Sequence, residues 1–175
     1  MKKTIYSAAL IGTGRIGYSL GLDKKREQPA SHSMALNANK RIELVAGCDI
    51  DKEALEIWHR ANRKAEAFAS VEEMLAFKPY DIITVAVNED AHLKTALAAI
   101  NAKPRLVILE KPVALNMNEG LLLKEACQKA NVPVLVNHER RFAKDYQKAK
   151  ELIKKGHDVI IYETNPEIGG VLRYG

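Results

Sequence analysis

Three glycines near the start of the chain have the spacing of a phosphate-binding turn. They lie in Gly12-Thr13-Gly14-Arg15-Ile16-Gly17, between an apolar run and a stretch that we expect to be helical, residues 15–22. Gly12 would permit a tight turn, Gly14 would let the backbone approach a diphosphate, and Gly17 would let the helix pack closely on the strand. Free amides at the positive end of the helix would bind the diphosphate. A glycine-rich turn without a ligand is the alternative, and a P-loop is excluded because no Gly-Lys-Ser/Thr follows.

An acidic residue follows the second apolar run, where a ribose partner is expected. Asp49 comes directly after residues 42–48, and its carboxylate can accept hydrogen bonds from both ribose hydroxyls of NAD. Against a 2′-phosphate at ~4 Å it would cost about 1–4 kcal/mol. NAD is therefore favoured over NADP, unless Lys52 or the basic cluster at 24–26 compensates. Helix capping is the alternative role for Asp49, although Asp51 can fill it.

The distance from the glycines to Asp49 exceeds the usual ~20 residues. We attribute the surplus to a loop inserted at residues 23–33, with a short helix over 33–39 behind it. The loop is either a lid on the cofactor side of the sheet or an inert excursion.

The elements that would position these residues alternate between strand and helix. Continuous apolar runs at 4–11, 42–48, 81–87, 105–109 and 132–136 are typical of strands buried on both faces, and 65–69 is a weaker candidate. Further helices are expected at 52–62, after a capping box at Ser70, at 92–100, after a second box at Asn116, and at 142–155. This alternation predicts an α/β fold with a doubly wound, mostly parallel sheet.

The bulk composition excludes several classes of protein. The 175 residues suffice for one full domain, and no apolar run reaches the ~18 residues of a membrane span. The net charge of +5 resides largely at 24–26 and 144–155, and no nucleic-acid-binding signature accompanies it. Cys48 and Cys127 are expected to be free thiols, and the histidines lack metal spacing. The apolar start has no cleavage site, so we expect a cytoplasmic protein without membrane, nucleic-acid or metal partners.

A lysine in an unusual context follows the run at 105–109. Residues 109–114 read LEKPVA, and they begin at the strand end where open α/β sheets bind ligands. Together with GTGRIG, ELVAGCDID, SVEEML and VLVNHERRF, this motif resembles the Gfo/Idh/MocA family of NAD(P)-dependent dehydrogenases, named for glucose-fructose oxidoreductase, inositol dehydrogenase and a rhizopine catabolism protein. The resemblance covers about residues 5–155 and implies a Rossmann fold.

The resemblance implies roles for individual residues. Lys111 would be catalytic, because a cation near the nicotinamide can hydrogen-bond the substrate hydroxyl and stabilise the negative charge that develops there. Glu110 would help to hold the cofactor, and the Lys111–Pro112 bond would be cis. The residues expected to bind NAD, with NADP as the alternative, are Gly12, Thr13, Gly14, Arg15, Ile16, Gly17, Asp49, Ile50, Val87, Asn88, His92, Glu110, Lys111 and Arg141.

Two of these assignments have an equally plain alternative. Arg140 and Arg141 would lie at the domain junction near the cofactor, or they are a surface basic pair. His92 fits the family's turn after the strand at 81–87, but Asn88 and Glu89 replace its usual proline and asparagine. His92 can therefore be a packing residue at the start of a helix.

The reaction implied is hydride transfer between a nicotinamide cofactor and a hydroxyl-bearing carbon of a sugar or polyol. The resemblance also implies a second, α+β substrate domain that supplies an acid/base histidine, and we expect most of it to lie outside these 175 residues. We expect a dinucleotide-binding domain at 1–155, followed at 156–175 by a linker and a first strand in EIGGVLRY. The chain can be a fragment of a longer enzyme or a stand-alone NAD-binding or sensing module. A homo-oligomer is possible in either case.

Overall fold

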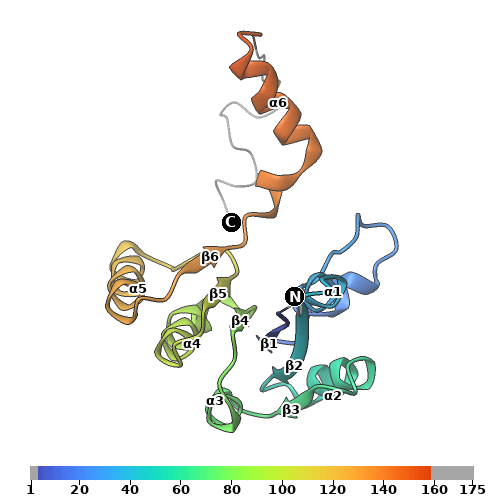
Figure 1. Ribbon diagram of the computed structural model, residues 1–175, viewed down its shortest axis with the longest axis vertical. Helices are drawn as coiled ribbons and strands as arrows, with labels where there is room; N and C mark the ends of the chain where they lie inside the picture. Colours follow the sequence, from blue (N-terminus) through green and yellow to red (C-terminus); the bar gives the residue numbers. More distant parts are fainter. Residues whose placement is uncertain (1–3, 159–175) are drawn as a thin grey trace. The chain divides into compact units, whose positions relative to one another are not determined.

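The computed structural model describes residues 4–158, which form two compact units, 4–137 and 138–158. The first unit is built on a six-stranded sheet in the order β3-β2-β1-β4-β5-β6, in which every pairing is parallel (Figure 1). The strands are β1 (Tyr6–Ile11), β2 (Ile42–Cys48), β3 (Glu66–Phe68), β4 (Ile82–Val85), β5 (Leu106–Leu109) and β6 (Val134–Val136). The doubly wound α/β fold and the six predicted strands are confirmed, with ends that differ by a few residues.

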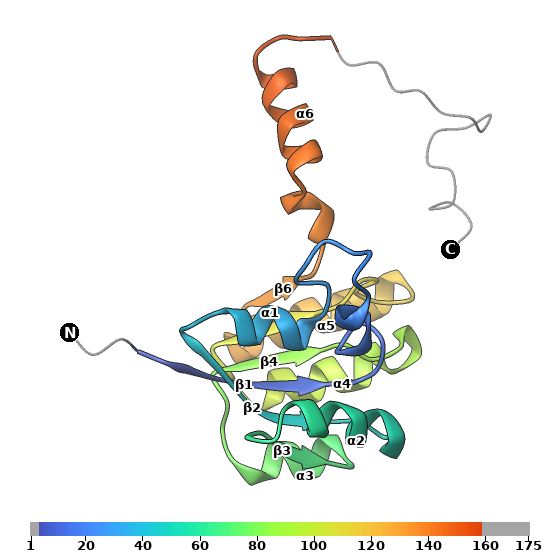
Figure 2. The same ribbon diagram turned by 90° about the vertical axis from the view of Figure 1, so that its right-hand side faces the viewer.

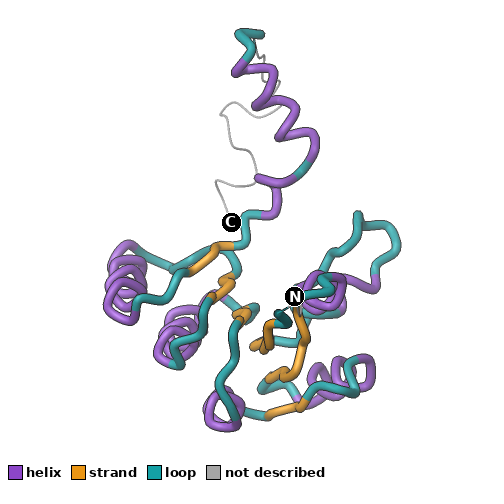
Figure 3. The backbone as a smooth tube through the Cα atoms, in the orientation of Figure 1, coloured by secondary structure: helices purple, strands orange, loops and turns teal. Residues whose placement is uncertain are grey.

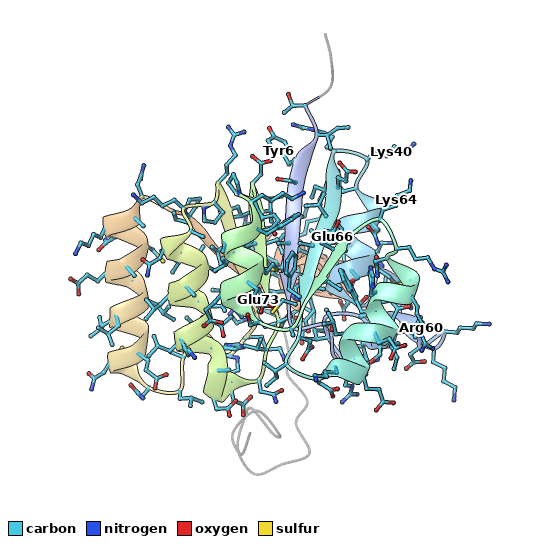
Figure 4. The ribbon with its side chains drawn as sticks, turned by 90° about the horizontal axis from the view of Figure 1, so that it is seen from below. Tyr6, Lys40, Arg60, Lys64, Glu66 and Glu73 are labelled. Atoms are coloured by element: carbon cyan, nitrogen blue, oxygen red, sulfur yellow. The ribbon has the colours of Figure 1, made fainter. Side chains whose placement is uncertain are left out.

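Helices cover both faces of this sheet, as Figure 4 shows from below. One layer holds α1 (His32–Ala38) and α2 (Lys52–Ala61), and the other holds α3 (Val71–Phe77), α4 (Glu89–Asn101) and α5 (Met117–Ala130). The amino-terminal ends of the strands carry Tyr6, Lys40 and Lys64, all labelled in Figure 4. The turns that follow the carboxyl ends therefore meet at the opposite edge, where the glycines and Asp49 were expected.

Alternate residues of β1 enter two separate cores. Ala9 and Ile11 pack in the core under α3, α4 and α5, whereas Ala8 and Leu10 pack in the core under α1 and α2. All four are essentially inaccessible to solvent. The continuous apolar run of this strand follows from that two-sided burial.

Three helix starts confirm the capping predictions. The Asp51 side chain accepts hydrogen bonds at the start of α2, Ser70 accepts from Glu73 N at 3.1 Å, and Asn116 accepts from Glu119 N at 3.0 Å. Asp51 therefore takes the capping role that was the alternative for Asp49.

The helix expected at residues 15–22 is not formed. Residues 14–18 make one hydrogen-bonded turn, and a short 3₁₀ helix, η1 (Ser19–Leu22), follows it. A loop then leads to α1, as Figure 3 shows. The amides of His32 and Ser33 donate to the carbonyls of Ile16 and Gly17, so α1 provides the partners that a continuous helix would have supplied. The predicted loop is present at residues 23–31, two residues shorter than expected, because α1 already begins at His32.

The second unit contains η2 (Glu139–Phe142) and α6 (Lys144–Lys154), close to the helix expected at 142–155. Glu151 accepts hydrogen bonds from Lys148 and Lys155, so two lysines of the basic run pair with an acidic residue of the same segment. The strand expected in EIGGVLRY lies outside the described residues. Figure 2 shows the helices from a second direction, and none in the described part of the chain is long and apolar enough to cross a membrane.

Candidate dinucleotide site

The three glycines of the motif have different surroundings. A Cβ on Gly12 would lie 2.4 Å from the Ala86 carbonyl oxygen, and the residue has φ +91°. A Cβ on Gly17 would lie 2.0 Å from the Gly12 carbonyl oxygen. A Cβ on Gly14 would meet nothing within 4 Å. Gly12 and Gly17 are therefore required by the protein's own packing, whereas Gly14 borders open space.

The turn between Gly14 and Gly17 offers amide donors. The Gly14 carbonyl accepts from the amides of Tyr18 and Ser19, which closes the turn. No residue in the described part of the chain accepts a hydrogen bond from the amides of Arg15 or Ile16. Unpaired amides beside an open Gly14 are what a bound diphosphate requires, because its oxygens need donors and close access to the backbone.

Asp49 is held against this turn. Its Oδ2 accepts from the Thr13 amide at 2.7 Å and from Thr13 Oγ1 at 3.1 Å, and its Oδ1 accepts from the Asp51 amide at 3.0 Å. The Asp49 residue is half-buried and lies next to the glycine turn. A carboxylate has about four acceptor positions, so Asp49 keeps capacity for a ribose hydroxyl.

The turn after β4 is tied to the turn after β5 by His92. This side chain on α4 is 1% exposed, with Nδ1 2.6 Å from the Pro112 carbonyl oxygen and Nε2 2.9 Å from the Val87 carbonyl oxygen. Asn88 is exposed as the residue before α4 and makes no capping hydrogen bond with its side chain. The geometry favours the packing interpretation of His92, which holds two strand-end turns at the proper separation.

Glu110 is the most buried acidic group at this edge of the sheet, with 5% of its surface exposed. Its Oε1 accepts hydrogen bonds from His32 Nε2, at 2.8 Å, and from Asn137 Nδ2, and its Oε2 accepts weakly from the Lys111 amide at 3.3 Å. Burial by itself raises the pKa of Glu110, but the hydrogen bonds from His32 and Asn137 outweigh it, so the pKa lies below its usual value. Glu110 is thus an ionised carboxylate bound inside the protein.

Lys111 is exposed between two anchored neighbours. His32 and Asn137 hold Glu110 on one side, and His92 holds the Pro112 carbonyl on the other. The Lys111–Pro112 bond is cis, as the resemblance implied. The backbone at Lys111 is therefore fixed while its side chain reaches solvent.

The other residues predicted for the site are spread more widely. Ile16 is half-buried and packs on the core under α1, Arg15 is exposed on the glycine turn, and Ile50 is 89% exposed after Asp49. Arg141 is exposed on η2 in the second unit, and its cofactor contact stays a prediction.

Two other kinds of site, a reactive cysteine and a metal cluster, are not found among the described residues. Burial and the nearby Asp49 carboxylate raise the pKa of Cys48 to about 12, which makes this thiol a poor nucleophile. Both cysteines are free, as expected. Within residues 4–158 no three His, Cys, Asp or Glu side chains gather where they could hold a metal ion.

The donor set therefore fits a dinucleotide. The glycine turn follows β1, Asp49 follows β2, and Glu110 and Lys111 follow β5, so the groups flank the point between β1 and β4 where the strand order reverses. Open α/β sheets bind dinucleotides across that point, with one nucleotide over each half of the sheet. Asp49 lies at the half built on β1, β2 and β3, and Glu110 and Lys111 lie at the half built on β4, β5 and β6.

Comparison with known proteins identifies the family. The sequence model of the Gfo/Idh/MocA family, described as an oxidoreductase family with an NAD-binding Rossmann fold, matches residues 6–138. The chain belongs to this family, and the matched part is its NAD-binding domain.

Individual relatives are similar over part of their length. Oxidoreductase P35 of Formosa agariphila is 44% identical over 71 residues, which is 41% of this chain and 22% of that protein. Myo-inositol 2-dehydrogenase of Thermotoga maritima is 25% identical over 147 residues, 84% of this chain and 40% of the relative. The WlbA dehydrogenase of Bordetella pertussis, crystallised with NADH and UDP-GlcNAcA, superposes with a TM-score of 0.73 at 28% identity, covering 87% of this chain and 42% of that one. The chain thus spans less than half the length of these relatives.

Two residues that bind Glu110 at this edge were not predicted from the sequence. His32 and Asn137 bind Glu110 from 78 and 27 residues away. Asn137 lies inside the VLVNHERRF motif, so its place after a strand was a usable signal. His32 lies beyond the insertion, and no spacing rule connects it with Glu110.

Proposed function

We propose that this chain binds NAD across the β1–β4 boundary, with its diphosphate on the turn between Gly14 and Gly17 and its adenosine ribose on Asp49. The observation that carries the proposal is the open space at Gly14 beside unpaired amides, with the Asp49 carboxylate fixed next to it. The carboxylate disfavours a 2′-phosphate through like charge, which supports NAD over NADP.

We further propose that the whole protein oxidises or reduces a hydroxyl-bearing carbon of a sugar or polyol. Myo-inositol 2-dehydrogenase among the relatives supports this substrate class, and a stand-alone sensing module is not favoured beside such relatives. When bound, NAD⁺ would accept the hydride in the oxidation, and NADH would donate it in the reduction. Lys111 would donate a hydrogen bond to the substrate hydroxyl and stabilise the negative charge on its oxygen. Two free cysteines support a reducing compartment such as the cytoplasm.

Calorimetric titration of the 175-residue chain with NAD⁺, NADH and NADP⁺ tests the binding proposal. We expect NAD⁺ to bind more tightly than NADP⁺. Gly14→Ala places a methyl group where the diphosphate must approach, so it should weaken NAD⁺ binding at least about tenfold without lowering stability. Gly120→Ala is the matched control, because a Cβ there also meets nothing within 4 Å but lies on α5.

Lys111→Ala should leave NAD⁺ binding within about threefold of the wild type, because the diphosphate contacts supply most of the affinity. Tighter binding of NADP⁺ than of NAD⁺, or equal effects of Gly14→Ala and Gly120→Ala, would contradict the proposed site. Absence of binding at millimolar NAD⁺ would overturn the function itself.

A further inference from the structure

Three hydrogen bonds to other parts of the chain hold the amino end of α1, although a loop precedes it. The amides of His32 and Ser33 donate to the carbonyls of Ile16 and Gly17, at 3.1 and 2.9 Å. The Ser33 hydroxyl accepts from the indole N–H of Trp58 at 2.8 Å, and Trp58 is fully buried. These contacts therefore fix the position of His32 and Ser33, where the chain returns from the loop.

That position places one imidazole against the Glu-Lys-Pro turn. The side chains of His32 and Glu110 are 9% and 6% exposed, and Nε2 lies 2.8 Å from Oε1. Ionised Glu110 can only accept, so the His32 Nε2 must carry the proton that is shared. An ionised carboxylate this deeply buried is costly unless donors satisfy it, and His32 and Asn137 are the side chains that do so.

We infer that His32 is a positioning residue for the nicotinamide half of the site: it binds Glu110, and through Glu110 it sets the backbone that presents Lys111. This inference rests on the proposed NAD-binding function. It assigns a purpose to the loop at residues 23–31, because the chain that returns from this loop places the His32 side chain against Glu110, which follows β5. If His32 only packed the fold, its loss would weaken binding of the whole ligand. If His32 positions Lys111, its loss should weaken binding of the nicotinamide half alone.

Two probes separate those roles. NADH occupies both halves of the site, whereas ADP-ribose lacks the nicotinamide and uses the half near the glycines and Asp49. We expect His32→Leu to weaken NADH binding about tenfold, the loss of a hydrogen bond to a charged group, while ADP-ribose binding changes less than about twofold. His32→Gln, which can still donate to Glu110, should bind NADH within about threefold of the wild type. His59→Leu, in the last turn of α2, is the matched control and should affect neither probe.

The outcomes distinguish the two proposals. Equal weakening of NADH and ADP-ribose by His32→Leu, or no effect on either, overturns the positioning role while leaving the binding function in place. Failure of the wild-type chain to bind either probe overturns the proposed function and this inference with it.

A measurement on the wild type guards against a variant that fails to fold. Nitrogen-15 spectra of the histidine rings should show His32 with its proton on Nε2 and a resonance that moves in Glu110→Gln. A His32 ring protonated only on Nδ1 would overturn the inference without any His32 variant.

Discussion

The two halves of the sheet end in carboxylates that are held in different ways. In the half formed by β1, β2 and β3, Asp49 is half-buried and accepts from the backbone and hydroxyl of Thr13 on the neighbouring turn. In the half formed by β4, β5 and β6, Glu110 is buried and depends on His32 and Asn137, side chains from distant parts of the chain. Every residue except proline has a backbone amide donor, so the first arrangement needs little beyond a strand end and an acid. The second requires particular residues and should tolerate substitution less well.

The boundary between β1 and β4, where the two halves meet, should be the site most sensitive to substitution, because a change there disturbs both halves. Gly12→Ala would put a Cβ 2.4 Å from the Ala86 carbonyl oxygen at a positive φ. Neither backbone can move away without disturbing β1 or β4, so we expect a loss of about 3 kcal/mol in the free energy of unfolding. Urea denaturation measures it. A loss below about 1 kcal/mol would show that the turn after β4 adapts.

Glu110→Gln removes the buried carboxylate in the half of the sheet formed by β4, β5 and β6. The amide group of glutamine would face donors that need an acceptor, so we expect a loss of about 2 kcal/mol at pH 7. The fold lowers the pKa of Glu110 from 4.5, so its contribution to stability is complete above that value and is lost as the pH falls through the lowered folded pKa.

The difference in unfolding free energy between wild type and Glu110→Gln should therefore narrow as the pH falls below 4.5. Parallel denaturation series at several pH values check this. A difference that stays constant down to acid pH would mean that charge on Glu110 does not contribute to stability.

Asp49→Asn removes the negative charge from the half of the sheet formed by β1, β2 and β3. Asparagine keeps an oxygen acceptor for the Thr13 amide, so the free energy of unfolding should fall by less than about 1 kcal/mol. Removal of the negative charge should reduce the preference for NAD⁺ over NADP⁺ by about tenfold, within the range that Coulomb repulsion allows. Titration calorimetry with both cofactors measures the ratio. An unchanged ratio would mean that another group excludes the 2′-phosphate.

Most of the fold could be predicted because its signals are local. Strands β1 and β4 are largely apolar runs buried on both faces, and the acceptor side chains of Asp51, Ser70 and Asn116 marked where helices begin. The helix expected at 15–22 was wrong for a reason that no local pattern carries. Its hydrogen-bond partners come from His32 and Ser33, beyond the insertion.

By itself, the amino-acid sequence determined the doubly wound, mostly parallel α/β class, the glycine turn and the family, since these depend on neighbouring residues and on parallel crossovers that permit few topologies. Only the tertiary structure decided which glycine borders open space, that His92 joins two turns, and that Glu110 binds His32 and Asn137. Those contacts join residues separated by many positions. Their geometry follows from how the sheet and helices pack, and spacing along the chain does not contain it.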